Sequence, residues 1–171
     1  MCSSDLTTDG SIPRIAGQHY RVLIRQLVDY RFDRRWDIRM ERYADRHVLG
    51  NPQAIADVAA YVSQMDRDAP RGVGAGDLVE RGAAVYAAQC AECHGASGEG
   101  DGEKLIPRIA GQHYKYLLRQ MYDAVDGRRP NFSRSHVRLL KRLERDDFVG
   151  LADVLSRAQW PDSPSAAPSG E

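Results

Sequence analysis

Ile12-Pro-Arg-Ile-Ala-Gly-Gln-His-Tyr20 occurs twice in this chain, because the same nine residues stand again at 106–114. Looser identity continues after each copy through Arg25-Gln26 and Arg119-Gln120. Nine consecutive identities are too many for chance, so one half of the chain is a copy of the other. The repeat therefore predicts two related units that follow one another along the chain.

Each copy leads into segments with the hydrophobic spacing of amphipathic helices. Apolar side chains recur every three or four residues over 20–28 in the first copy and over 114–125 in the second. A further helix is expected to close each copy, at 55–62 and at 148–155, and a helix over 77–89 precedes the second copy alone. No segment has the pattern of a strand, so the predicted fold class is all-α.

Composition indicates a globular protein, with 42% hydrophobic and 28% charged residues. Lys plus Arg and Asp plus Glu both number 24, so the chain lacks the basic excess of a nucleic-acid-binding protein. No apolar run approaches the roughly 20 residues of a transmembrane helix. The first residues also lack the basic and then apolar pattern of a signal peptide. We expect no nucleic-acid partner, no transmembrane segment and no signal sequence within this chain.

The connecting segments predict the domain boundaries. Residues 1–65 form a degenerate copy without a Cys-x-x-Cys-His motif, and residues 66–76 are rich in glycine, which is typical of a linker. Residues 77–160 form the complete copy. The tail 161–171 consists mainly of Pro, Ser, Ala and acidic residues, so it cannot bury apolar surface and is predicted to be disordered.

A Cys-x-x-Cys-His motif, Cys90-Ala-Glu-Cys93-His94, follows the helix predicted over 77–89 and precedes a glycine-rich loop. Two thiols at this spacing reach the two vinyl groups of one porphyrin, and the adjacent imidazole then faces the iron. A zinc site would need a second ligand pair, and a thioredoxin-like motif would need a βαβ context. The sequence has neither, so it predicts one covalent haem c held by Cys90 and Cys93, with His94 on the iron.

The residues around this motif resemble a known family. Gly82-x-x-x-Tyr86-x-x-x-Cys90-x-x-Cys93-His94, followed by the glycine-rich loop and Ile106-Pro107, is similar to the pattern of class I cytochromes c. The duplication and Ala110-Gly111-Gln112 resemble the tandem, two-domain, di-haem periplasmic cytochromes c. The resemblance covers residues 77–157 well and residues 11–65 in part. It implies a helical fold wrapped around the haem, an electron-carrier function and a periplasmic location, with the first haem site lost.

The resemblance also implies two further residues of the haem site. In that family the proline after the haem loop lends its carbonyl to the proximal imidazole, which implies Pro107 as the partner of His94. The family's distal methionine stands seven residues before a leucine that begins a short acidic turn. Here Leu143 begins that turn and His136 stands seven residues earlier. His136 is therefore the candidate sixth ligand, and the alternative is a solvated loop histidine.

Other histidines and methionines fit structural roles better than iron ligation. His19 and His113 occupy equivalent positions in the two copies, and the first copy is expected to bind no haem. Met121 falls on the apolar face of a predicted helix, where methionine usually fills a core. His47 lies in the first copy and is expected at the surface.

Segment 128–145 is strongly basic, with seven Arg or Lys residues against Glu144 alone. One interpretation is a solvated helix face that also provides partners for the haem propionates. The other is a basic collar that steers an acidic redox partner, an effect that weakens with salt. The two interpretations are compatible.

These features favour a mono-haem cytochrome that transfers single electrons between periplasmic partners or serves as a subunit of an oxidoreductase complex. The pattern favours a carrier over an enzyme. The alternative function is a haem enzyme or gas-ligand-binding protein with an open or displaceable sixth iron site.

The first copy is interpreted as a packing or docking module. About 65 residues with one helix missing can hardly bury their own apolar surface, so Leu23, Leu27, Val58 and Val62 are expected to lie partly against residues 77–157. At the N-terminus, Cys2 and the two serines after it resemble the start of a mature bacterial lipoprotein. The preferred reading of Cys2 is an accidental cysteine, with a lipid anchor as the alternative.

Overall fold

The computed structural model describes residues 9–66 and 71–159, and every regular element within these ranges is a helix. In chain order the helices are α1 (Tyr20–Arg31), α2 (Ile38–Ala44), α3 (Pro52–Ser63), α4 (Val79–Gln89), α5 (Ala91–His94), α6 (Tyr114–Val125), α7 (Arg134–Leu140) and α8 (Arg145–Arg157). The predicted all-α class is confirmed. Cys2 and the tail 161–171 lie outside the described residues. In the described part of the chain, no helix has the length and apolar character needed to cross a membrane.

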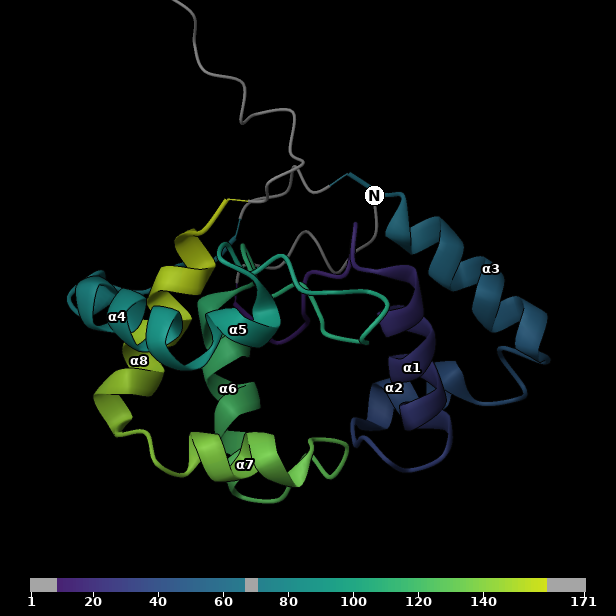
Figure 1. Cartoon of the computed structure of the whole chain (residues 1–171). Coiled ribbons are helices and arrows are strands. Elements are labelled where there is room, and N and C mark those ends of the chain that lie inside the picture. The colour runs from purple at the N-terminus through teal and green to yellow at the C-terminus, as the bar shows by residue number, and fades with distance from the viewer. Residues whose placement is uncertain (1–8, 67–70, 160–171) are drawn as a thin grey trace, which may run out of the picture.

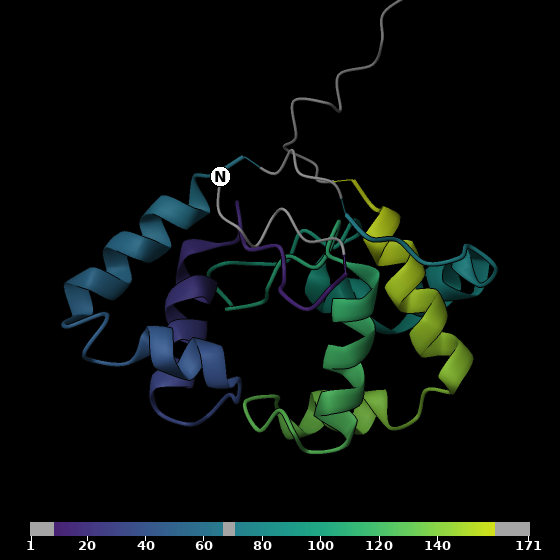
Figure 2. The same ribbon diagram turned by 180° about the vertical axis from the view of Figure 1, so that it is seen from behind.

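The helices form two groups that lie side by side (Figures 1 and 2). Helix α1 packs against α2 and α3, while α8 packs against α4 and α6. Short helices α5 and α7 contact α4 and α6 respectively. We refer to residues 9–66, with α1–α3, as the first unit and to residues 71–159, with α4–α8, as the second unit. Each unit contains one copy of the repeated nonapeptide.

Helices α4 and α8 cross at two glycines. A Cβ atom at Gly82 would lie 2.0 Å from the carbonyl oxygen of Gly150, and a Cβ at Gly150 would lie 2.6 Å from the carbonyl oxygen of Leu78. Only residues without side chains allow the two backbones to come this close. The approach buries Tyr86 against Leu151 in the main core of the second unit.

The first unit has a small core of its own. Leu23 from α1 packs with Ala59 and Val62 from α3, and residues of the same unit surround them. Val58 is 39% exposed. The expectation that these apolar faces lie partly against residues 77–157 is therefore wrong for Leu23 and Val62, whose core neighbours belong to the first unit. The physical reason is that α1 and α3 cover each other's apolar faces.

The two nonapeptides instead contact each other directly, in a reciprocal arrangement. The side-chain amide of Gln18 accepts from the backbone N–H of Arg108 and donates to its carbonyl, both at 2.9 Å. The amide of Gln112 makes the same pair of bonds with Arg14, both at 2.8 Å. The repeated sequence thus forms the junction between the two units.

The C-terminal part of the predicted linker is fixed to the second unit. The Gly72 carbonyl accepts from the backbone N–H of Tyr114 at 2.9 Å, and the Gly72 N–H donates to Nδ1 of His113 at 3.1 Å. Further on, the Gly76 N–H donates to a carboxylate oxygen of the buried Asp153 at 2.6 Å. These bonds extend the second unit back to residue 71.

Candidate haem site

The two motif cysteines lie at the junction between α4 and the four-residue helix α5. Backbone N–H groups of Cys93 and His94 both donate to the Cys90 carbonyl, at 3.2 and 3.0 Å, so the motif forms one tight turn. The thiols of Cys90 and Cys93 are both free, with Cys90 half-buried and Cys93 exposed. Burial, and then the neighbouring Cys93, raise the pKa of Cys90 to about 11. The turn therefore presents two thiols and one imidazole from five consecutive residues.

The glycine-rich loop carries the chain back to His94. The Gly100 N–H donates to the His94 carbonyl at 2.8 Å, and Asp101 and Ile106 form an isolated antiparallel bridge. A Cβ at Gly100 would lie 2.5 Å from the Ile106 carbonyl oxygen, so this position requires glycine. The next residue, Pro107, comes to lie beside the imidazole.

His94 has its two ring nitrogens in different environments. Nδ1 lies 3.2 Å from the carbonyl oxygen of Pro107, which makes Nδ1–H the donor and leaves Nε2 as the nitrogen able to meet a metal. Burial lowers the pKa of His94, and the bond to Pro107 opposes that change. The imidazole is therefore neutral near pH 7, which is the form that binds metals.

His136 lies opposite His94. The ring centroids are 6.2 Å apart, and the rings are inclined at 49°. His136 belongs to the first turn of α7, where the Ser133 hydroxyl caps its backbone N–H, so the expected loop is a short helix here. Burial, followed by electrostatic interaction with His94 and Arg129, lowers the pKa of His136 to about 4. Both imidazoles are thus neutral at physiological pH.

The spacing of the two rings fits a single iron between them. A metal–nitrogen bond of about 2 Å, plus about 1 Å from that nitrogen to the ring centre, places the centroids about 6 Å apart for two imidazoles on one metal. The observed separation is 6.2 Å. Within 9–66 and 71–159, no cluster of three or more His, Cys, Asp or Glu residues could hold a bare metal ion. The donor set therefore suits a metal that arrives inside a porphyrin.

The remaining histidines and methionines of the second unit have other surroundings. Met121 packs in the core between α6 and α8. His113 is fully buried and accepts the Gly72 N–H, while His19 of the first unit contacts the Glu99 carbonyl at 2.9 Å. His113 and His19 thus tie loops together.

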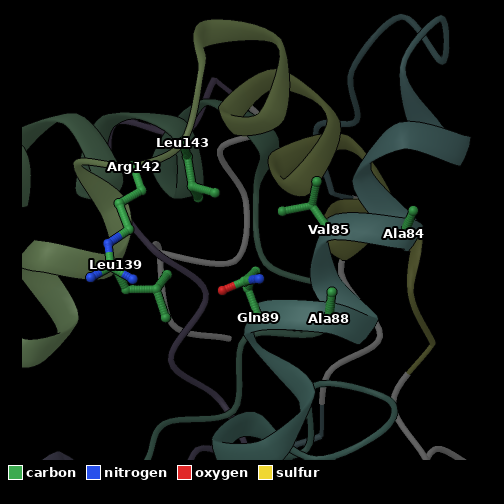
Figure 3. A pocket seen from close by; sticks show the side chains of 7 residues that line it. All are labelled: Ala84, Val85, Ala88, Gln89, Leu139, Arg142 and Leu143. Carbon is green, nitrogen blue, oxygen red and sulfur yellow. The ribbon is translucent and has the colours of Figure 1, made fainter.

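A pocket of about 420 Å³ lies between α4 and the connection from α7 to α8 (Figure 3). Its wall is mostly apolar, with Gln89 and Arg142 as the polar members. The lining residues are Ala84, Val85, Ala88, Gln89, Leu139, Arg142 and Leu143. Because Gln89 directly precedes Cys90, this pocket borders the cysteine turn.

The basic segment 128–145 divides into paired and unpaired cations. Arg128 forms ion pairs of 2.8 Å with Asp123 and with Asp126. Five further cations are exposed, and none of them has an ion-pair partner among the described residues. These are Arg134, Arg138, Lys141, Arg142 and Arg145. The outer surface of α7 and the turn after it is therefore positively charged.

This combination of an all-α unit and a Cys-x-x-Cys-His turn backed by a glycine loop defines a class I cytochrome c domain. Residues 79–139 match the family described as cytochrome c. The resemblance noted from the sequence is thereby confirmed. Membership of this family implies that the domain binds a c-type haem covalently.

Relatives of the chain include proteins named cytochrome c4. It is 31% identical over 140 residues to cytochrome c4 of Azotobacter vinelandii, a match that covers 71% of this chain and 63% of that protein. It is similar to the solved cytochrome c4 of Acidithiobacillus ferrooxidans, with a TM-score of 0.71 and 27% identity over 88% of this chain and 92% of the other. A shorter match, 34% identical over 84 residues, is to a thiosulfate dehydrogenase electron acceptor of Thiomonas intermedia, covering 49% of this chain and 38% of that protein. The chain spans less than two thirds of the length of these sequence relatives.

Proposed function

We propose that this protein is a mono-haem c-type cytochrome that transfers single electrons between periplasmic redox partners or within an oxidoreductase complex. Cys90 and Cys93 would hold the haem covalently, and His94 and His136 would be the protein ligands of its iron. The observation that carries the proposal is the 6.2 Å separation of the two neutral imidazoles beside the paired thiols.

The haem would supply a one-electron couple between ferrous and ferric iron. Pro107 accepts the Nδ1–H bond of His94, and such a bond fixes the ring orientation and raises the basicity of the ligating nitrogen. His136 is held by the Ser133 cap and by Phe132, whose ring stacks on it at 4.8 Å. Two held imidazoles leave no open position for an exogenous ligand, which favours electron transfer over gas binding.

We propose one haem per chain. Residues 1–65 contain no Cys-x-x-Cys-His motif, so this region would be a haemless repeat followed by a linker at 66–76 and by the haem domain at 77–160. The first unit nevertheless keeps its own core and its junction to the second unit. It would therefore act as a packing module.

The positive outer surface of α7 would dock an acidic redox partner. A relative is named as the electron acceptor of a thiosulfate dehydrogenase, so a dehydrogenase is a reasonable class of donor. Attraction between unpaired surface charges is screened by salt, with a screening length of about 8 Å at physiological ionic strength. We expect the rate of electron transfer with such a partner to fall as salt is added.

The test of the function is spectroscopic. Holoprotein matured with a c-type haem assembly system is expected to contain one covalent haem per chain, low-spin in both oxidation states, without a thioether charge-transfer band. Release of all haem by acidic acetone would refute covalent attachment. High-spin iron that binds carbon monoxide readily would favour the gas-binding alternative, and two haems per chain would refute the mono-haem state.

A further inference from the structure

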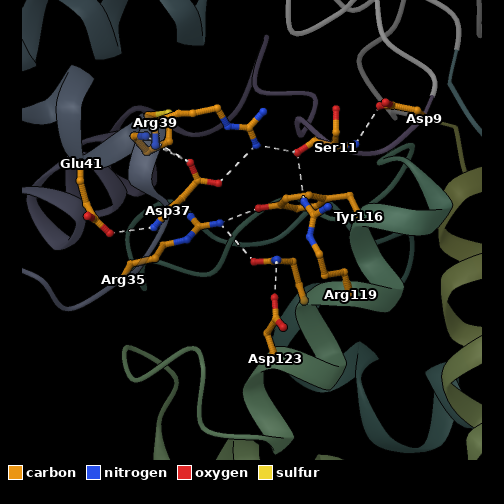
Figure 4. A network of polar contacts seen from close by, with 11 residues as sticks. Asp9, Ser11, Arg35, Asp37, Arg39, Glu41, Tyr116, Arg119 and Asp123 are labelled. Atoms are coloured by element: carbon orange, nitrogen blue, oxygen red, sulfur yellow. Dashed lines mark hydrogen bonds and ion pairs between the residues drawn. The ribbon is translucent and has the colours of Figure 1, made fainter.

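Two arginines from different units converge at the junction. Arg35 lies between α1 and α2 and is 7% exposed, although it carries a full positive charge. It donates to the Tyr116 hydroxyl at 2.6 Å and to the Gln120 side chain at 3.2 Å, both on α6 of the second unit (Figure 4). Its guanidinium also lies 4.7 Å from the ring centroid of Tyr30.

Arg129 approaches the same place from the connection between α6 and α7. Its guanidinium donates to the side-chain oxygen of Gln26 at 3.3 Å, and Arg35 donates to that same oxygen. The Nε–H of Arg129 is buried and has no hydrogen-bond acceptor. Two guanidinium groups therefore share one neutral amide oxygen. The Arg129 guanidinium still has one N–H without an acceptor.

This arrangement lacks an anion. Among the described residues, neither Arg35 nor Arg129 has a carboxylate within ion-pair distance. Burial, and then the charge of Arg35, lower the pKa of Arg129 to about 10. A buried charge without a partner destabilises a protein by several kcal/mol, and carboxylates are the anions that guanidinium groups bind best. The pair is therefore suited to bind carboxylates other than those of the described residues.

The position of the pair indicates where those carboxylates come from. The guanidinium of Arg129 stacks on Phe132 at 4.5 Å, and Phe132 in turn stacks on the ring of His136 at 4.8 Å. A haem bound between His94 and His136 would bring two propionate groups into this neighbourhood. The described carboxylates that act on the two arginines, Asp37 on Arg35 and Asp123 on Arg129, do so from beyond ion-pair distance.

We propose that Arg35 and Arg129 bind the two haem propionates, so that the first unit completes the haem site of the second. This inference rests on the proposed haem site. The unpaired Nε–H of Arg129 and the Tyr116 hydroxyl hydrogen are the further donors for these carboxylates. Arg35 is then a haem-binding residue, and the first unit supplies a cation to the haem site of the second.

The test compares reduction potentials of holoprotein variants. A cation beside the propionates favours the ferrous state, so Arg35→Gln is expected to lower the reduction potential, and Arg35→Lys is expected to restore part of it. The matched control is Arg39→Gln, which removes the same charge from an exposed position in the same unit. A potential for Arg35→Gln equal to that of Arg39→Gln would overturn the proposal.

A second measurement does not depend on the folding of a variant. In the ferrous holoprotein, which is diamagnetic, proton nuclear Overhauser contacts are expected from the propionate methylenes to the Tyr116 ring and to the Arg35 side chain. Their absence would overturn the proposal even if covalent haem is present. If the chain does not take up haem at all, the proposed function fails instead. Contacts restricted to Arg129 would overturn the assignment of Arg35, and a potential that responds to added acetate would overturn the proposal by showing that the pair binds a free carboxylate instead.

Discussion

Single residues at the candidate iron site differ in how far the surrounding chain dictates their position. Cys90, Cys93 and His94 are brought together by one turn, so their spacing in sequence already describes their spacing in space. His136 is held instead by a helix cap and by contact with Phe132. Its place opposite His94 depends on how α7 packs on α6.

His136 gives the first prediction. Replacing the imidazole by a thioether favours ferrous iron, so His136→Met is expected to raise the reduction potential of the holoprotein. His136→Ala is expected to give high-spin iron that binds carbon monoxide, as seen in absorption and paramagnetic-resonance spectra. The control is His47→Ala, an exposed histidine of the first unit. A low-spin spectrum and an unchanged potential in His136→Ala would mean that another residue holds the iron.

Helix packing explains two features at the scale of elements. The close crossing of α4 and α8 requires glycine on both helices. Helix α8 begins with a capping box, in which Glu144 and Asp147 satisfy each other's backbone N–H groups. Arg81 of α4 donates to both of these carboxylates, at 2.8 and 2.7 Å, and so joins the two helices at one end.

Gly82→Ala is expected to destabilise the second unit by roughly 1–3 kcal/mol, because the added methyl group meets the Gly150 carbonyl and the helices must separate. Chemical denaturation of the holoprotein measures the change. Ala87→Ser on the exposed face of the same helix is the control and is expected to have little effect. Equal stability of Gly82→Ala and the wild type would show that the two helices can move apart at no cost.

Asp147 gives a pH-dependent prediction. The hydrogen bond from Arg81, together with that from the Glu144 backbone, lowers the pKa of Asp147 below its ordinary value of 3.8. A lowered pKa means that the stabilisation is complete above that ordinary value and is lost as the pH falls through the folded-state pKa. Asp147→Asn is therefore expected to reduce stability at pH 7 by about 1 kcal/mol, and to weaken the loss of stability below pH 3.8.

The control for Asp147 is its neighbour. Asp146→Asn also removes a carboxylate from the first turn of α8, but Asp146 is exposed and lies outside the capping box. Denaturation midpoints measured between pH 2 and 7 would separate the two variants. The assignment fails if the two substitutions change stability and its pH dependence alike.

The junction between the two units sets the organisation of the whole molecule. Each nonapeptide places a glutamine amide on the backbone of the other, and each has a glycine with positive φ just before that glutamine, +64° at Gly17 and +61° at Gly111. The two nonapeptides, residues 12–20 and 106–114, are thus identical in sequence where they contact each other. A reciprocal contact requires the same groups on both sides.

Gln18→Leu and Gln112→Leu are expected to have similar effects, because they remove equivalent pairs of bonds. Each removes the two hydrogen bonds that join one glutamine amide to the backbone of one arginine, at about 0.5–1.5 kcal/mol for each bond. Thermal denaturation measures the effect, with the exposed Gln53→Leu as control. If both substitutions change stability as little as Gln53→Leu does, the reciprocal contact contributes little to stability.

The residues of the candidate site differ in whether the sequence alone could reveal them. Cys90, Cys93 and His94 could be found from sequence because their geometry is local, and the helices could be found because apolar periodicity reflects burial. Arg129 belongs to the basic segment 128–145, for which propionate partners were predicted, but its pairing with Arg35 of the first unit could not be found from the sequence. The two arginines are 94 positions apart, and only the packing of α1 on its own unit and the junction to α6 bring them to one amide oxygen.

The amino-acid sequence by itself determined the all-α class, the duplication and the haem-type motif, since each depends on spacing within one turn, one helix or one repeat. The tertiary structure decided three other matters: that the first unit buries Leu23 and Val62 internally, that the nonapeptides bind each other, and that His136 stands 6.2 Å from His94. The physical reason is that hydrogen bonds and packing act through space. Residues far apart in sequence are brought together only when the whole chain has folded.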